Sequence, residues 1–282
     1  MARIANASEA TVGTIEKKRR KSNPPAPFNT TSLMAAASSI GIKPARTMRI
    51  AESLYMNGYT SYPRVDNTVY PDNLDLREVL NILAKVPDFR EGAEALLAKG
   101  KLTATRGKQE TTDHPPIYPT GAADPDKLRP EEWKLYSLIC RRFMATLSEA
   151  ATLESTKVTL DVAGEPFTAR GDVLVDPGYR SVYPYGLKKD EQMPPLAEGQ
   201  VLDFWDADCA HKQTEPPARF SSGKLVQEME AKGLGTKATR HDMIERLYSR
   251  HYIVNDPIEP TQLGIAIIDA LEKFAKTITT PD

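Results

Sequence analysis

The sequence predicts an α+β fold that is mainly helical, in which a helical domain is inserted into a small antiparallel β domain and a second helical domain follows. Helical periodicity dominates residues 26–150 and returns after residue 216, whereas apolar and polar residues alternate in the stretch between them. One further strand pattern precedes the helices. We therefore expect four parts: a strand and linker at 1–25, a helical domain at 26–150, the rest of the β domain at 151–215, and a second helical domain at 216–282.

The first expected element is a strand over residues 11–17, followed by the basic and then proline-rich run Lys17–Pro27. Proline-rich sequence favours an extended chain without internal hydrogen bonds, so this run is expected to be a stiff linker. A single strand is unstable because its backbone N–H and C=O groups need partners. It is therefore expected to pair with the sheet formed later in the chain, which would give the inserted helical domain a hinge.

Capping and breaking residues divide the first helical stretch into several helices. Thr30, Thr31 or Ser32 can cap a helix that Gly41 ends, and a second helix opens at the proline at position 44 and ends near residue 58. Two short helices with a tight connection resemble a helix-turn-helix. Further helices are expected at 74–85, 91–99 and 130–148.

The pattern changes near residue 152, where short alternating stretches are separated by glycine and proline. This pattern is typical of a small antiparallel sheet. Val158, Leu160 and Val162 alternate with polar residues, and similar stretches lie near Phe167–Val175, Arg180–Tyr185 and Val201–Trp205, so a strand is expected at each.

A second helix-turn-helix is expected after the strands. Ser221 or Ser222 can cap a helix, the glycines within 233–235 interrupt it, and Thr236 can cap the next one. The segment Tyr252–Val254 then resembles a short wing, and one more helix follows it.

Composition limits the classes of function. The chain has 282 residues, 40% of them hydrophobic, and a net charge of −1, which favours several modest cores and produces no global positive field. Any anionic partner must meet local basic patches such as Lys17–Lys21, and each patch alone is also explained as a solvated surface. The two cysteines form no Cys-x-x-Cys pair, and no apolar run suits a membrane span or a signal peptide, so we expect a cytoplasmic protein without a membrane partner.

The segment Tyr62–Val69 places a tyrosine two positions before an arginine. A phenol is unreactive at neutral pH unless its proton can leave and the charge that develops on the attacked group is stabilised. The planar guanidinium of Arg64 could stabilise that charge, which suggests attack of Tyr62 on a phosphate. Taken alone, the triplet is more often a packed tyrosine beside a solvated arginine.

Three stretches carry recognisable motifs in a fixed order. The first comprises Pro27–Leu33, Arg46–Met48 with Ala51 and Leu54–Tyr55, and then Gly58–Tyr59 and Tyr62–Asp66. The second is His114–Thr120, and the third joins Pro217–Ser221 with Gly233–Arg240. Together they closely resemble the active-tyrosine region, the His-x-x-Ile-x-Pro-Thr segment and the later DNA-binding helix-turn-helix of type IA DNA topoisomerases. The amino-acid sequences of the first and third stretches are closer to those of archaeal-type members than to those of the commonest bacterial ones.

The resemblance implies that the inserted domain is a winged-helix, CAP-like domain and that the last domain is the start of a second winged-helix-like one. It implies that the Tyr62 hydroxyl attacks a phosphodiester of single-stranded DNA, leaving a 5′-phosphotyrosyl enzyme and a free 3′-hydroxyl, so that religation needs no ATP. Arg64 would hold the non-bridging oxygens, and His114 would hydrogen-bond the same or a neighbouring phosphate or serve as a structural donor. Asp66 could orient Arg64 or stabilise the turn.

The resemblance also implies a DNA-binding surface. Lys237, Thr239 and Arg240 are expected at a helix N-terminus, where backbone N–H groups and the helix dipole favour a phosphate. Arg219 could add a contact or form a structural ion pair. Such contacts position a strand without reading its sequence. The expected partner is single-stranded or underwound DNA, and the protein is expected to act as a monomer.

The sequence departs from the family in one respect. Family members begin with an acidic, metal-binding Toprim domain, which we do not find in these 282 residues. They also continue beyond the point that corresponds to residue 282 of this sequence. We therefore expect a central fragment with no metal ligands of its own and little activity alone, whose Mg²⁺ is bound by the Toprim domain of the parent enzyme. Two alternatives are a non-catalytic winged-helix module that binds single-stranded DNA and a helical interaction protein that has lost the activity.

Overall fold

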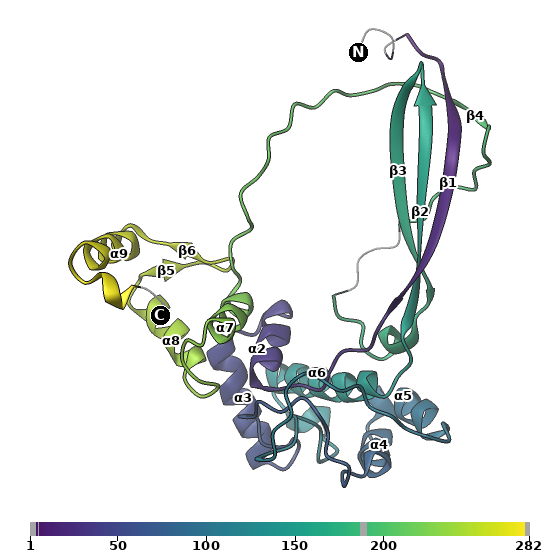
Figure 1. Cartoon of the computed structure of the whole chain (residues 1–282). Coiled ribbons are helices and arrows are strands. Elements are labelled where there is room, and N and C mark those ends of the chain that lie inside the picture. The colour runs from purple at the N-terminus through teal and green to yellow at the C-terminus, as the bar shows by residue number, and fades with distance from the viewer. Residues whose placement is uncertain (1–3, 5, 187–190, 280–282) are drawn as a thin grey trace. The chain divides into compact units, whose positions relative to one another are not determined.

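The computed structural model describes residues 4, 6–186 and 191–279, and the chain forms two compact units (Figure 1). We call Met1–Pro24 with Glu149–Pro216 the β unit, and Pro25–Ser148 with Pro217–Asp282 the helical unit. The expected α+β class is confirmed. The division into four domains stays a prediction, and the two helical stretches lie in one compact unit.

The β unit is built on a four-stranded antiparallel sheet with the order β3-β2-β1-β4. The N-terminal strand pairs with the later sheet, as expected, in a register that runs from Thr11 opposite Asp161 to Ser22 opposite Ala151. Figure 1 shows the first three strands lying alongside one another for most of their length. The bounds are β1 Glu9–Ser22, β2 Ala151–Val162, β3 Glu165–Asp176 and β4 Val201–Asp203.

The linker expected from Lys17 onward was placed too early. The basic run Lys17–Lys21 belongs to β1, because β2 continues to offer ladder partners as far as Ala151. Backbone pairing therefore overrides the loop-like composition of this run. The unpaired extended chain begins only after Ser22.

The strand expected at Arg180–Tyr185 was wrong. The chain instead forms a short 3₁₀ helix, η2 Gly178–Ser181. Gly178 has a φ of +46°, and a Cβ there would lie 2.7 Å from the backbone of Ala150, so only glycine fits this turn. The N–H of Tyr179 bonds the carbonyl of Glu149 at 2.9 Å, which holds the turn against the start of β2.

The helical unit contains the two expected helical stretches. A short hairpin follows the second stretch where a wing was expected, although the winged-helix comparison itself stays a prediction. None of the described helices is both long enough and apolar enough to cross a membrane. The elements are α2 Thr30–Ser39, α3 Pro44–Met56, α4 Leu76–Ala84, α5 Pro87–Leu97, η1 Pro125–Lys127, α6 Pro130–Thr146, α7 Ser222–Ala231, α8 Arg240–Ser249, β5 Ile253–Val254, β6 Glu259–Pro260, α9 Gln262–Phe274 and η3 Lys276–Ile278.

The cap of α2 is Asn29 and not one of the three hydroxyl residues that follow it. Asn29 and Ser32 form a reciprocal capping box, with the Ser32 N–H bonding the Asn29 side chain at 2.9 Å. The hydroxyl of Thr30 is used elsewhere, because it accepts the Val65 N–H at 2.8 Å. The start of α2 is thereby joined to the loop that carries Tyr62.

The core of the helical unit surrounds α6, whose Tyr136, Leu138 and Phe143 are fully buried. Helix α7 packs closely on α2, because a Cβ at Gly223 would lie 2.7 Å from the Cβ of Ser38. Beside this contact lies an apolar cluster that joins the two helical stretches. Its buried members are Met34, Met48, Val226 and Ile244.

Candidate functional site

Backbone hydrogen bonds bring the Tyr62 segment beside the His114 segment. The N–H of Ser61 bonds the carbonyl of Tyr118 at 2.9 Å, and the Tyr118 N–H bonds the Ser61 hydroxyl at 3.0 Å. The Asn67 side-chain amide adds a bond to the His114 carbonyl at 3.1 Å. Two motifs about fifty residues apart in sequence are therefore fixed next to each other.

Tyr62 lies half-buried between two aromatic rings. Its ring is edge-on to Tyr55 of α3, with centroids 5.3 Å apart, and tilted against His114 at 4.9 Å. His114 is exposed. The two rings restrict the orientation of the phenol, and one of them is an imidazole, a side chain that often serves as a general acid or base.

Arg64 is held by two partners within the helical unit. Its Nε donates to Glu52 Oε1 of α3 at 2.7 Å, and Nη2 donates to the same oxygen at 2.5 Å. Its Nη1 donates to the carbonyl of Ala238 at 3.1 Å. Asp66, considered above as a partner of Arg64, pairs with Lys237 instead, and the carboxylate that contacts Arg64 is Glu52.

Lys237 bridges the two motif-bearing loops. Its Nζ lies 3.0 Å from Asp66 Oδ2 and 3.3 Å from Asp113 Oδ2, so one ammonium contacts both carboxylates. Hydrogen bonds from the Thr111 hydroxyl and the His114 N–H, followed by Lys237, lower the pKa of Asp113 to about 2. The bond with Asp66 and then the bond with Asp113 raise the pKa of Lys237.

The other expected DNA-binding residues lie in different environments. Helix α8 begins at Arg240 with Thr239 as its N-cap, and Thr239 Oγ1 accepts the Thr236 N–H at 2.9 Å. The Arg240 side chain is only 9% exposed, and it bonds Glu230 and two backbone carbonyls of the preceding turn. These contacts tie Arg240 to the preceding turn, and its expected DNA-binding role stays a prediction. Arg219 is exposed, just before α7.

Three groups of this site, two carboxylates and one backbone carbonyl, were not predicted from the sequence. Glu52 lies ten positions before Tyr62 on α3, and Asp113 immediately precedes His114. Each flanks a motif, but nothing in its spacing identifies the cation it pairs with. The carbonyl of Ala238 carries no side-chain signal at all. Proximity to the motifs could have indicated Glu52 and Asp113 as candidates, and only the tertiary contacts assign their partners.

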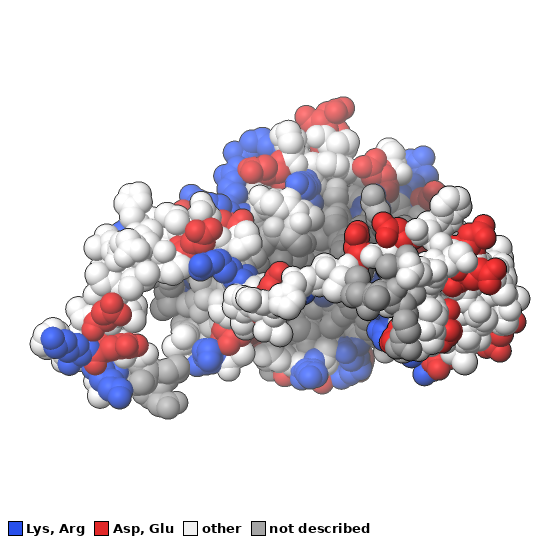
Figure 2. All heavy atoms as spheres, turned by 90° about the horizontal axis from the view of Figure 1, so that it is seen from above, with Lys and Arg blue, Asp and Glu red and all other residues white. Residues whose placement is uncertain are grey.

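The charged surface is mixed rather than dominated by one sign. Figure 2 shows small groups of Lys and Arg separated by Asp and Glu on the face it displays. The basic run Lys17–Lys21 alternates between the two faces of the β sheet, because successive strand residues point to opposite sides. Local contacts rather than a broad field must therefore bind any anionic partner.

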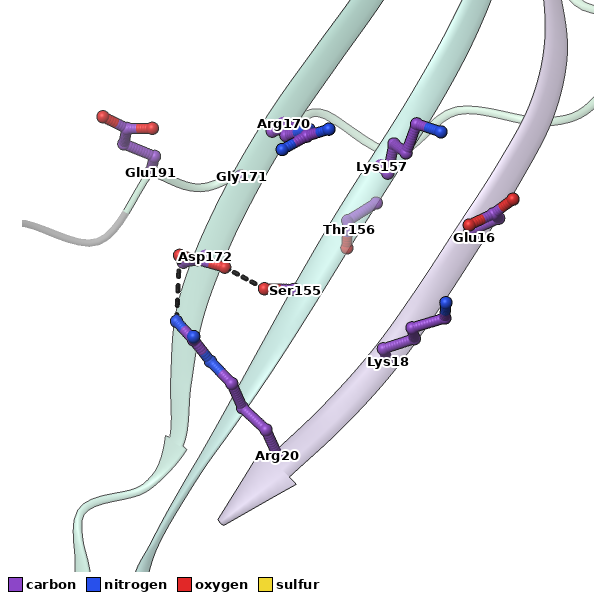
Figure 3. Close-up of a pocket in the computed structure, with 10 residues that line it drawn as sticks. All are labelled: Glu16, Lys18, Arg20, Ser155, Thr156, Lys157, Arg170, Gly171, Asp172 and Glu191. Carbon is purple, nitrogen blue, oxygen red and sulfur yellow. Dashed lines mark hydrogen bonds and ion pairs between the residues drawn. The ribbon is translucent and has the colours of Figure 1, made fainter. Parts of the chain in front are cut away.

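One face of the β sheet forms a groove of about 430 Å³, drawn in Figure 3. Asp172 on β3 is one of its lining residues, where it accepts a hydrogen bond from Ser155 and pairs with Arg20 at 3.3 Å. Cations and carboxylates in the lining nearly balance, which argues against a strong anion site. The charged lining residues are Lys18, Arg20, Lys157 and Arg170, with Glu16, Asp172 and Glu191.

Residues 1–282 match a family model described as DNA topoisomerase. The chain is 43% identical over 273 residues to DNA topoisomerase 1 of Archaeoglobus fulgidus, covering 97% of this chain and 41% of that protein. It is 39% identical to DNA topoisomerase 1 of Thermoplasma acidophilum, covering 92% and 33%.

A solved structure agrees with these similarities. Topoisomerase I from Thermotoga maritima superposes with a TM-score of 0.74 at 25% identity, covering 99% of this chain and 48% of that one. The chain thus spans 41% and 33% of the lengths of these two curated relatives. The expected resemblance, including its archaeal character, is confirmed.

Proposed function

Because this chain belongs to the DNA topoisomerase family, we propose that it is the tyrosine-bearing part of an enzyme that cleaves and rejoins single-stranded DNA through a 5′-phosphotyrosyl intermediate. The observation that supports this most is the placement of Tyr62 against His114, with Arg64 following in the same loop. A nucleophile, a group that can exchange protons and a bidentate cation are the parts that phosphoryl transfer to a tyrosine requires.

The proposed reaction exchanges one phosphodiester for another. The Tyr62 oxygen loses its proton and bonds to phosphorus, the bond from phosphorus to the 3′ oxygen breaks, and that oxygen takes up a proton. Rejoining reverses each step, so the phosphotyrosyl bond supplies what religation needs and no nucleotide is consumed. His114 is the candidate for proton exchange because its ring lies 4.9 Å from the Tyr62 ring.

Arg64 is proposed to stabilise the charge on the phosphate oxygens during attack. Losing one such donor typically costs about 3 kcal/mol of transition-state stabilisation. Glu52 orients the guanidinium through Nε and Nη2. The third donor, Nη1, bonds the neutral carbonyl of Ala238. A charged phosphate can displace this neutral partner more easily than it can displace the Glu52 carboxylate.

Mg²⁺ is proposed to be held by an acidic Toprim domain of the whole enzyme. Within the described residues, no group of three or more His, Cys, Asp or Glu side chains is arranged to hold a metal ion. The metal site therefore does not fit the residues described here, and no step above passes through it. Without that domain we expect the chain to form little covalent product.

The test uses end-labelled single-stranded DNA with Mg²⁺, with and without a Toprim domain added in trans. We expect a covalent DNA–protein adduct that increases with the added domain and disappears in Tyr62→Phe. Tyr55→Phe is the matched control, because it removes a hydroxyl from the ring that packs against Tyr62. An adduct that persists in Tyr62→Phe would contradict the assignment of the nucleophile. DNA binding without an adduct under any condition would favour a non-catalytic single-stranded DNA-binding module.

A further inference from the structure

The turn between α7 and α8 contacts the loops of both motifs through neighbouring residues. Lys237 pairs with Asp66 and with Asp113, and the carbonyl of Ala238 accepts a hydrogen bond from Arg64. The turn thus meets the Tyr62 loop at two points and the His114 loop at one. We call Lys237, Asp66 and Asp113 the ionic clamp.

The charges of the ionic clamp are unequal and accessible. One ammonium faces two carboxylates, so the trio carries a net charge of −1 when ionised. The side chains of Lys237, Asp66 and Asp113 are 28%, 38% and 46% exposed. Partly solvated ion pairs are weak and can exchange partners, because water stabilises the separated charges. An incoming phosphate can therefore reach Lys237 and compete for it.

The contacts beneath the ionic clamp are of a different kind. Helix α7 rests on α2 through Gly223 and Ser38, and Val226 and Ile244 are buried with the methionines of α2 and α3. These contacts join helices and do not involve the loop residues 64–66 or 113–114. The loops are joined to the turn by polar contacts, so the loops can separate from the turn while the helices stay packed.

We propose that Lys237 is shared between the ionic clamp and DNA. Without DNA, Lys237 holds the Tyr62 and His114 loops to the turn. When a strand binds, one of its phosphates replaces the two carboxylates as the partner of Lys237, and the two loops are released from the turn. The proposal rests on the proposed function, since it supposes that a DNA strand reaches this site. Strand binding then loosens the contacts that hold the nucleophile-bearing loop. Lys237 is a positioning residue, because it acts through the loops and not on the reacting atoms.

The first test measures amide hydrogen exchange in the wild-type chain without DNA, by mass spectrometry of peptides covering residues 59–68, 109–118 and 234–240. Lys237→Ala should speed exchange in these peptides about threefold, which is the size expected for the loss of partly exposed ion pairs. Lys232→Ala is the matched control, because among the described residues the ion pair of Lys232 is with Glu228 of the adjoining helix α7, at 3.7 Å. Raising the salt concentration should speed exchange in the wild type and leave Lys237→Ala unchanged.

The second test measures binding of a single-stranded oligonucleotide of about 12 nucleotides in a double-mutant cycle. In the wild-type background, Lys237→Ala should weaken binding about threefold, because a phosphate must first displace the carboxylates. In an Asp66→Asn, Asp113→Asn background, the same change should weaken it about tenfold, because the ammonium is then held by no carboxylate. The cycle separates this coupling from the general repulsion between carboxylates and DNA.

Each outcome decides a part of the proposal. Equal losses in the two backgrounds would overturn the sharing of Lys237, and equal exchange in Lys237→Ala and Lys232→Ala would overturn the ionic clamp. If the wild-type chain bound no DNA at low salt, the proposed function and the exchange with phosphate would both fail. The hydrogen-exchange result would still report on the ionic clamp by itself, because that measurement contains no DNA.

Discussion

In the helical unit, side chains such as Leu138 and Phe143 are fully buried, whereas the long strands of the β unit place few apolar side chains out of solvent. The buried apolar residues of the described part of the β unit are Ala10, Val12, Ala151, Val158, Val162 and Tyr183. The helical unit therefore depends on packing, and the β unit depends on its backbone ladder and on cross-strand pairs.

This difference matters for the site. Tyr62, Arg64, His114 and Lys237 all lie on loops of the helical unit, where a packed core holds the supporting helices in place. The proposed attack on a phosphate would require groups fixed to within a fraction of an ångström, which favours a packed scaffold. The β unit, whose sheet exposes polar side chains on both faces, can bend at a lower cost in lost packing.

The largest expected effect is on the free energy of unfolding, and it is compared between a leucine of the helical unit and a leucine of the β unit. Leu138→Ala in α6 should lower the free energy of unfolding by about 2–5 kcal/mol, because it leaves a cavity in a fully buried site. Leu153→Ala in β2, which is only half-buried, should cost about 1 kcal/mol. Urea denaturation followed by circular dichroism measures both values, and equal losses would remove the distinction between the units.

A smaller effect concerns buried hydrogen bonds. The Tyr136 hydroxyl donates to the Gly121 carbonyl at 2.7 Å and accepts the Ala123 N–H at 3.3 Å, and burial strongly raises the pKa of this phenol. Tyr136→Phe should therefore cost about 1–3 kcal/mol, because two backbone groups lose their partner. Thr14→Val is the control in the β unit, where an exposed hydroxyl pair with Thr159 is lost at little cost. Thermal unfolding compares the two variants.

The smallest effect is a dependence on pH. Hydrogen bonds from Arg129 lower the pKa of Glu132 to about 2, from an ordinary value near 4.5. A lowered pKa in the folded state means that the stabilisation is complete above about pH 4.5 and is lost as the pH falls toward about 2. The wild type should therefore exceed Glu132→Gln in urea midpoint at pH 7, and the two should converge on acidification.

The carboxylate of the β unit that we compare with Glu132 is Glu154, which also pairs with an arginine. Arg19 lowers the pKa of Glu154 across the strands, but this pair is exposed to solvent. Glu154→Gln should change the midpoint less than Glu132→Gln does, and added salt should remove the difference because it screens exposed charges. A larger effect at Glu154 than at Glu132 would contradict the expected order of the two units.

Much of the local structure could be predicted from sequence because its signals are local. Pro44 and Pro130 open their helices, Ser221 caps α7, and the alternation around Val158 marks β2. The secondary-structure predictions were wrong where backbone contacts with residues distant in sequence determine the local structure. The run Lys17–Lys21 is a strand because β2 pairs with it, and residues 180–185 follow a turn held by the start of that strand.

The sequence by itself determined the family, the order of the motifs and the candidate nucleophile Tyr62, because these depend on residue types and short spacings. Only the tertiary structure decided which groups surround that tyrosine. Arg64 pairs with Glu52 and Lys237 with Asp66 and Asp113, over separations of up to 171 residues (237 − 66). An ion pair requires two charges to meet within about 4 Å, and no local pattern specifies which of many carboxylates folding brings to a given cation.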